Sequence, residues 1–188
     1  MSTLPASASP ALLDLFSRLE ERGLAEHGRA VADLAVRVAA SLALPRLLVE
    51  RIELAALLHD AGKVELPQEV LDRRGPLTMA DWRVIRSHPA RSARLVGAIP
   101  AVASLAPWIR AHHERWDGRG YPDRLAGERI PLAARIVHAC DAFDAMTCSR
   151  CYRSALPGDA ACAEIAAGSG SQFDPVVARA LVAAVLDT

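Results

Sequence analysis

The sequence predicts an all-α protein, and two observations support this prediction. Apolar residues recur at spacings of three and four, as at Val31, Leu34 and Val38, which places them on one face of a helix. No stretch shows the sustained alternation of apolar and polar residues that a half-buried strand needs. With 188 residues, of which 52% are hydrophobic, the chain is long enough to fill one substantial core.

Capping and turn residues set the limits of the expected helices. In chain order these helices cover residues 12–19, 26–42, 47–58, 79–88, 89–96, 102–113, 131–146, 159–167 and 175–186. The third closes near Gly62, and the fourth begins at Met79 because Thr78 is a residue type that caps helix N-termini. It stops by His88, since Pro89 disfavours helical geometry in the residue before it and suits the first turn of a new helix.

Two regions lack a helical period. Residues 1–9 are small, polar and proline-containing, and we expect them to form a disordered N-terminal arm. Residues 114–130, ERWDGRGYPDRLAGERI, hold three glycines, and a loop of this length in a compact helical domain is usually functional. No linker divides residues 10–188, which we expect to form one domain.

Charge and composition exclude several classes of protein. The 22 basic and 22 acidic residues cancel, which argues against a protein that binds a nucleic-acid polymer through a general positive field. The N-terminus lacks the basic start and apolar run of a signal peptide, and no window approaches about 18 uninterrupted apolar residues. We therefore expect a soluble, cytoplasmic protein without a membrane partner, whose four cysteines are reduced thiols.

Histidines and aspartates concentrate at helix ends and on apolar helix faces. The candidates are His27, His59, Asp60, His88, His112, His113 and Asp141, and the sixth histidine, His138, lies in the same apolar run as Asp141. Any one of these histidines alone is explained by an ordinary hydrogen bond in the core. Together they would each need a separate polar partner, whereas a shared metal centre satisfies them all. Imidazole and carboxylate ligands without thiolate suit iron, manganese or zinc, and two such ions close together can hold a phosphoryl group.

The order of these motifs carries a family resemblance. His27, LLHDAGKVELP (57–67), His88, HHERWDGRGYP (112–122) and Asp141 follow one another at suitable gaps from about residue 20 to 180. This arrangement resembles the HD-GYP family of metal-dependent cyclic di-GMP phosphodiesterases, a branch of the HD superfamily. The resemblance implies that residues 10–188 form an HD-GYP-like catalytic domain, a single HD-domain-like helical bundle with a long functional loop.

The resemblance also implies a division of the ligands between two divalent metal ions, iron or manganese before zinc. One ion would be held by His27, His59, Asp60 and Asp141. Asp60 would bridge to a second ion held by His88, His112 and His113, and the glycine-rich loop after this pair would form the rim of the substrate cleft. A hydroxide bridging two metals is a nucleophile at neutral pH, because a metal lowers the pKa of bound water from about 15.7 to near 7.

Lys63 is the only lysine among the 22 basic residues and follows the HD pair by one turn. A compact ammonium suits a phosphate beside metals, so we expect Lys63 to act with Asp60 in catalysis and to contact the substrate, with chance placement as the alternative. Arg119, Tyr121, Arg150 and Arg153 are further candidates for substrate contacts, because guanidinium groups pair with phosphate and aromatic faces stack on guanine. Ordinary solvated charge is the competing interpretation for the arginines.

Two departures from the family pattern affect the expected product and the metals. Some relatives bind a third metal through a glutamate four residues before the first histidine, where this chain has Gly23. Glu20 would share the face of His27 only if one helix ran unbroken through Gly23. We therefore expect two metals and linear pGpG as product. The CxxC of Cys148 and Cys151 lacks a second pair and is weak evidence for zinc.

Alternatives to this function remain open. An HD-type phosphohydrolase of another nucleotide or cyclic dinucleotide would keep the metals and change the loop contacts. A non-catalytic module that binds a nucleotide or a partner is the third hypothesis. A regulatory protein could dock on the GYP loop through Trp116, or near it through Trp82, although tryptophans at helix spacing usually belong to the core. The sequence leaves the oligomeric state open.

Overall fold

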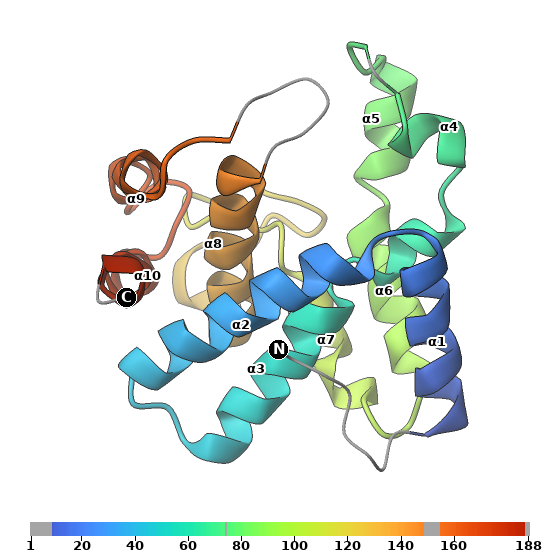
Figure 1. Ribbon diagram of the computed structural model, residues 1–188, viewed down its shortest axis with the longest axis horizontal. Helices are drawn as coiled ribbons and strands as arrows, with labels where there is room; N and C mark the ends of the chain where they lie inside the picture. The colour runs from blue at the N-terminus through green and yellow to red at the C-terminus, as the bar shows by residue number, and fades with distance from the viewer. Residues whose placement is uncertain (1–8, 74, 149–154, 187–188) are drawn as a thin grey trace.

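The computed structural model describes residues 9–73, 75–148 and 155–186, and these residues form helices and connecting loops without a β-strand (Figure 1). The α-helices are α1 (Pro10–Glu21), α2 (Ala25–Ser41), α3 (Arg46–Leu58), α4 (Gln68–Leu71), α5 (Met79–Ile85), α6 (His88–Gly97), α7 (Ala106–Arg110), α8 (Leu132–Thr147), α9 (Gly158–Ala167) and α10 (Pro175–Leu186). Short 3-10 turns lie at Ala61–Glu65, Ala103–Leu105 and Gly127–Arg129. The all-α prediction is confirmed.

Helices α2, α3 and α8 form the centre of the bundle. Helix α2 packs against α3 on one side and against α8 and α10 on the other. The residues that predicted α2 lie on its inner face, where Val31 and Val38 are fully buried beside Ile52 of α3 and Ile136 of α8. Burial of one such aliphatic side chain contributes about 1.5 to 3 kcal/mol, so this seam fixes how the three helices cross.

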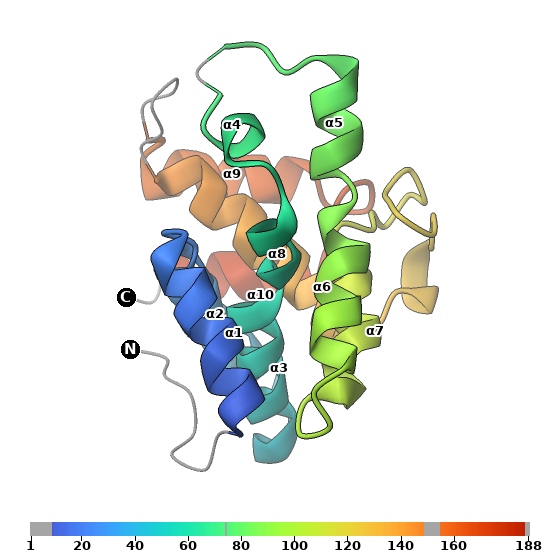
Figure 2. The same ribbon diagram turned by 90° about the vertical axis from the view of Figure 1, so that its right-hand side faces the viewer.

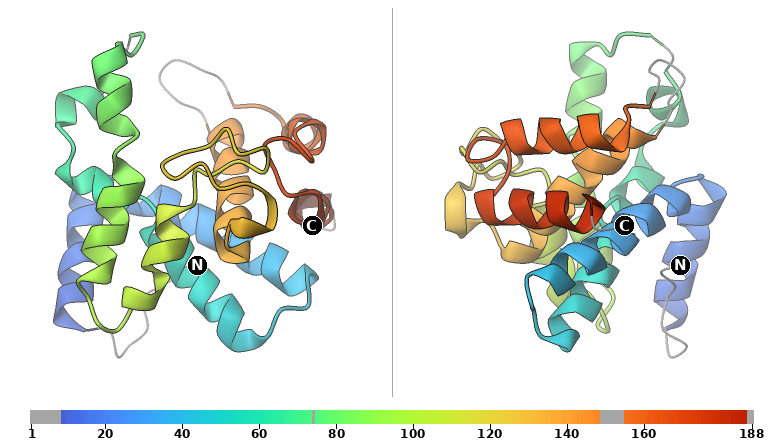
Figure 3. Two further views of the ribbon diagram at one scale, coloured as in Figure 1. Left: turned by 180° about the vertical axis from the view of Figure 1, so that it is seen from behind. Right: turned by 60° about the vertical axis from the view of Figure 1, so that its left-hand side comes forward.

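The other helices surround this centre. Helices α9 and α10 run side by side and both pack on α8 (Figure 3). Helix α6 packs against α7 and against the 3-10 turn that follows α3, and α1 lies against the same turn (Figure 2). The segment that carries α4 and α5 stands out from the body on one side of the molecule, as Figure 1 shows. Among the described helices, none is long and apolar enough to cross a membrane.

The helix limits agree with the sequence at capped ends and differ elsewhere. Thr78 begins α5 with a reciprocal capping box to Asp81, as its residue type predicted. The helix expected over residues 102–113 was wrong in its extent. Helix α7 begins only at Ala106, with Pro107 in its first turn, and it ends at Arg110. Helix α4 and the 3-10 turns were not predicted. Of the expected arm at residues 1–9, only Ser9 lies among the described residues, and its side chain caps α1.

Candidate metal centre

Five separate segments bring the candidate ligands together at one place. His27 lies in the first turn of α2, His59 and Asp60 follow α3, His88 begins α6, and Asp141 lies on α8. His112 and His113 lie in the turn after α7, outside the helix in which the sequence placed them.

A glycine allows α3 and α6 to meet at this centre. A Cβ on Gly62 would come within 2.4 Å of the His88 carbonyl oxygen, so only glycine permits this approach of the 3-10 turn to α6. The backbone amide of Gly62 also donates to Ser92 Oγ at 2.7 Å. This contact holds Asp60 against His88.

Three of the histidines are oriented by the backbone of their own turn. The Nδ1 atoms of His59, His88 and His112 lie 2.6, 2.7 and 2.6 Å from the carbonyl oxygens of Ala56, Ile85 and Ile109. A carbonyl only accepts, so each Nδ1 carries the hydrogen and donates it. The Nε2 atom of each ring then points into the centre, where it can offer a lone pair whenever the ring is neutral.

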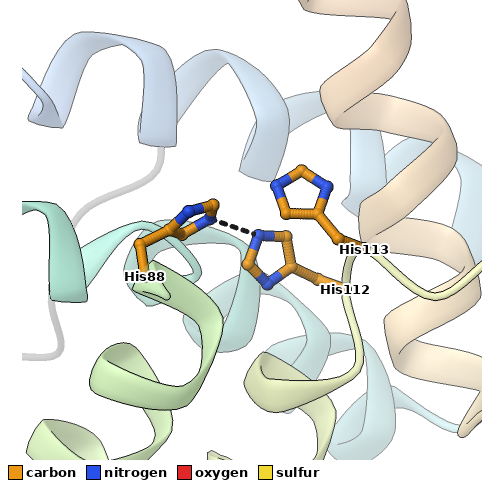
Figure 4. A group of neighbouring side chains, drawn as sticks. All are labelled: His88, His112 and His113. Carbon is orange, nitrogen blue, oxygen red and sulfur yellow. Dashed lines mark hydrogen bonds between the residues drawn. The ribbon is translucent and has the colours of Figure 1, made fainter. Parts of the chain in front are cut away.

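The inward Nε2 atoms meet without a donor between them. Burial lowers the pKa of His88 to about 4 and that of His112 well below its ordinary value, so both rings are neutral. Their Nε2 atoms nevertheless lie 3.2 Å apart, the contact drawn dashed in Figure 4, where His113 lies beside them. His88 Nε2 also lies 3.2 Å from Asp60 Oδ1. Lone pairs that converge in this way fit a bound cation and no hydrogen-bond network.

Asp60 faces both halves of the histidine cluster with different oxygens. Its Oδ1 atom lies near His88, whereas Oδ2 lies 3.5 Å from His59 Nε2 and 3.8 Å from His27 Nε2. The buried Asp60 Oδ1 and His59 Nε2 atoms have no hydrogen-bond partner among the described residues. The potential ligand atoms form two groups, His88–His112–His113 and His27–His59–Asp141. Within each group these atoms lie within 4.8 Å of one another. A carboxylate between them has the geometry of a metal bridge.

The carboxylates around His27 create a strongly cation-attracting site. Burial lowers the pKa of His27, but hydrogen bonds to Asp141 and Asp144 and the charge of Asp60 outweigh it and raise the pKa to about 10. His27 Nε2 lies 3.1 Å from Asp141 Oδ1. Burial raises the pKa of Asp60. The positive charge of Lys63 and the neighbouring histidines more than offset this effect and hold the pKa well below its usual range. The same negative field that holds a proton on His27 would attract a divalent ion.

Asp144 is a functional candidate that the sequence reasoning missed. It is buried on α8, and its Oδ2 atom accepts a hydrogen bond of 2.6 Å from His27 Nδ1. A carboxylate that accepts from the outer nitrogen of a ligating histidine fixes the ring and raises its basicity. The signal was present in DAFD (141–144), because residues three apart share a helix face and both aspartates would point at His27.

Removing this carboxylate is expected to weaken metal binding. Asp144→Ala should raise the dissociation constant for Mn²⁺ about 10- to 100-fold, since loss of such a histidine partner typically has that effect. Asp144→Asn should lose less, because its amide oxygen still accepts from Nδ1–H. Calorimetry of Mn²⁺ binding compares both variants with Asp14→Ala, which changes an exposed aspartate on α1. An unchanged dissociation constant in Asp144→Ala would show that His27 needs no anchor.

Lys63 and five of the candidate metal ligands line one cleft. The cleft has a volume of about 880 Å³ and is bordered by His27, Asp60, Lys63, His88 and Asp141, among other residues. Lys63 Nζ donates to Asp60 Oδ2 at 2.5 Å, so the ammonium lies beside the candidate bridging carboxylate. The volume suffices for a small ligand of nucleotide size.

The GYP loop is held against the metal centre by a buried carboxylate. Glu114 is 2% exposed and accepts backbone hydrogen bonds from Asp123 at 2.6 Å and Leu125 at 3.1 Å. Gly120 lies so close to the chain at His113 that a Cβ would come within 2.6 Å of its carbonyl oxygen. Tyr121 is thereby brought onto His113, with ring centroids 4.9 Å apart and planes at 27°.

The remaining substrate candidates are not all brought to the cleft. Tyr121 borders it, whereas Arg119 is exposed and borders a separate cavity of about 450 Å³ with Arg86 and Arg124. The candidates Arg150 and Arg153, and also Cys151 of the CxxC motif, lie outside the described residues. Cys148 Sγ donates to Asp144 Oδ1 at 3.4 Å, and Cys140 and Cys162 take part in no disulfide among the described residues.

The third-metal position and the two tryptophans are also placed by the structure. Helix α1 ends at Glu21 and α2 begins at Ala25, so no single helix runs through Gly23. Glu20 forms an ion pair with Arg29. Trp116 is half-buried, and the guanidinium of Arg135 lies 5.6 Å from its ring. Trp82 is 44% exposed and borders the cleft.

Comparisons with known proteins agree with this geometry. The family model described as HD domain matches residues 12–177. The chain is 44% identical over 147 residues to the cyclic di-GMP phosphodiesterase response regulator RpfG of Xanthomonas campestris pv. campestris, covering 77% of this chain and 39% of that protein. It is 39% identical over 127 residues to 3'3'-cGAMP-specific phosphodiesterase 3 of Vibrio cholerae, covering 68% of this chain and 28% of that protein.

A solved structure shares the fold. The HDG"Y"P protein Bd1817 from Bdellovibrio bacteriovorus aligns with a TM-score of 0.72 and 20% identity, over 89% of this chain and 54% of that one. The chain spans well under half the length of the two curated relatives. The family match, which extends over most of the chain, and the motifs at the metal centre lead to one conclusion. The chain belongs to the HD domain family, in its HD-GYP branch.

Proposed function

We propose that this domain is a metal-dependent phosphodiesterase that hydrolyses cyclic di-GMP. The observation that supports this most directly is the placement of Asp60, whose two oxygens face two separate groups of histidines. In this proposal His27, His59, Asp60 and Asp141 hold one ion, and Asp60 bridges to a second ion held by His88, His112 and His113, with iron or manganese as the metals. The activity named for the 44%-identical relative supports the choice of substrate.

The bound metals would supply a hydroxide nucleophile and polarise the phosphoryl oxygens. The residues of the chain provide the rest of the site. Lys63 extends a positive charge into the cleft beside Asp60, where it would stabilise negative charge that develops on the phosphoryl group. Burial raises the pKa of Tyr121 far above its usual value, so its hydroxyl stays protonated. It can form hydrogen bonds but does not act as a base. Its stacking on His113 holds that ligand in place.

The product is expected to be linear pGpG. A second hydrolytic step in relatives with a third metal would use the position of Gly23, which has no side chain and lies between two helices. Metal-loaded protein incubated with cyclic di-GMP should therefore accumulate pGpG, measured by chromatography over time. Rapid conversion of added pGpG to GMP by the pure protein would contradict the expected end product, and an unchanged cyclic substrate would contradict the proposed function.

A second candidate substrate is a mixed cyclic dinucleotide. One relative, 39% identical, is named as specific for 3'3'-cGAMP. The metal centre treats both phosphodiesters alike, so only contacts to the bases can discriminate. Parallel measurement of kcat/KM on cyclic di-GMP and 3'3'-cGAMP decides between them, with preference for the mixed dinucleotide favouring this second function.

A further inference from the structure

The cleft carries two aromatic side chains that differ in how much ring surface they leave open. Among the aromatic residues that the structure describes, Tyr121 and Trp82 border the cleft together with His88 and His113. Purine bases bind proteins by stacking on such rings, so either residue is a candidate surface for a substrate base.

Tyr121 is already covered. The imidazole of His113 stacks on its ring at 4.9 Å, and the guanidinium of Arg86 lies over the ring at 5.3 Å from the centroid. His113 borders the main cleft, Arg86 borders the smaller cavity of about 450 Å³, and Tyr121 borders both. The ring of Tyr121 is therefore in contact with one neighbour from each cavity. A base could stack on it only by displacing a candidate metal ligand or the arginine.

Trp82 has the open surface that Tyr121 lacks. It lies on α5, is 44% exposed, and borders the cleft but not the smaller cavity. The guanidinium of Arg86 lies 5.6 Å from its ring centroid. Arg86 thus contacts both aromatic rings without bordering the cleft. An aromatic ring that is supported on one side and open to the cleft loses little freedom when a base stacks on it.

The surroundings of Trp82 include apolar side chains that suit a base. Pro76, Leu77 and Ile85 border the cleft near Trp82 in the sequence, and Arg73, which also borders it, is paired with Asp81 at 3.1 Å. Lys63 and five candidate metal ligands form another charged part of the cleft. A cyclic dinucleotide has a charged ring of phosphates and ribose with a flat aromatic base on either side. Its phosphodiester can thus reach the metal centre while one base lies against α5.

We propose that Trp82 is the stacking platform for one purine base of the substrate, held in position by Arg86. This inference rests on the proposed function, because it concerns how the same cleft recognises a cyclic dinucleotide. Stacking is tolerant of base identity, so Trp82 contributes affinity for purines and the choice between guanine and adenine is made elsewhere.

Kinetics of three variants test the proposal. Trp82→Ala should raise KM for cyclic di-GMP roughly 5- to 150-fold, the effect of removing one base–aromatic stack, with a much smaller change in kcat. Trp82→Phe keeps an aromatic face and should restore most of the affinity. Met79→Ala is the matched control, since Met79 is also on α5, is 73% exposed and does not border the cleft. An unchanged KM in Trp82→Ala, or an equal rise in Met79→Ala, would overturn the proposal.

Fluorescence separates this proposal from the proposed function, because it needs no turnover. Stacked guanine quenches indole emission, so GMP should quench the tryptophan fluorescence of the wild-type protein, whereas ribose 5-phosphate should not. The quench should vanish in Trp82→Phe and persist in Trp108→Phe and Trp116→Phe. If cyclic di-GMP is not hydrolysed but this quenching pattern is observed, the stacking role of Trp82 is supported and the proposed phosphodiesterase function is contradicted. If hydrolysis occurs and the quench survives in Trp82→Phe, the platform is wrong and the function stands.

Discussion

His113→Ala is expected to bind close to one metal ion per chain instead of two and to lose hydrolysis of cyclic di-GMP. His113 belongs to the group His88–His112–His113, and Asp60 lies between this group and the other half of the centre. Loss of one of three imidazoles leaves too few ligands to hold an ion there. A single metal cannot both activate the water and stabilise the leaving oxygen, so turnover should fall roughly a thousandfold or more.

Metal analysis and the rate of hydrolysis are measured on the same preparation. His138→Gln is the matched control, because His138 is a buried histidine whose ring centroid lies 6.2 Å from that of His113 but which belongs to neither ligand group. The control should retain two ions. Stoichiometry still near two in His113→Ala would refute the assignment of this residue as a ligand.

The sequence predicted the fold where a helix follows from local rules. The three- and four-residue spacing in α2 and the cap at Thr78 depend only on neighbours in the chain, and the structure agrees at both places. The end of α7 was predicted wrongly although Pro107 marks its first turn, because the apolar run that continues past it has helical spacing. A pattern of this kind cannot show where the chain leaves the helix to place His112 in the centre.

The candidate centre divides in the same way. Chain order and residue type were sufficient to single out the histidines and the two aspartates, which the structure places together. The anchors of three outer nitrogens could not be predicted, because they are backbone carbonyls one turn earlier. The anchor of His27, Asp144, was missed although its spacing from Asp141 places both on one helix face. The role of Tyr121 was also out of reach, because its cover by His113 and Arg86 depends on how Glu114 folds the loop.

Lys63→Ala is expected to leave both ions bound and to lower the rate of hydrolysis. A protonated ammonium has no lone pair to donate, so Lys63 is not expected to ligate a metal. It does contact Asp60 Oδ2 at 2.5 Å and borders the cleft, which places its charge beside the position of the phosphoryl group. Loss of one pre-organised electrostatic contact of this kind typically costs about 2.7 to 4 kcal/mol, or roughly a hundred- to a thousandfold in kcat.

The comparison with Asp60→Ala separates chemistry from assembly of the site. Asp60 lies between the two groups of histidines, so its removal should lose metal and activity together, whereas Lys63→Ala should lose activity alone. Metal content and kcat are therefore measured on both variants and on Lys63→Gln, which keeps the length of the side chain nearly unchanged without its charge. Wild-type turnover in Lys63→Ala would exclude a catalytic role for the lysine. Loss of metal in Lys63→Ala would show instead that the contact of Lys63 with Asp60 holds the bridging carboxylate in place. The charge of Lys63 would then be needed for metal binding and not only for the chemical step.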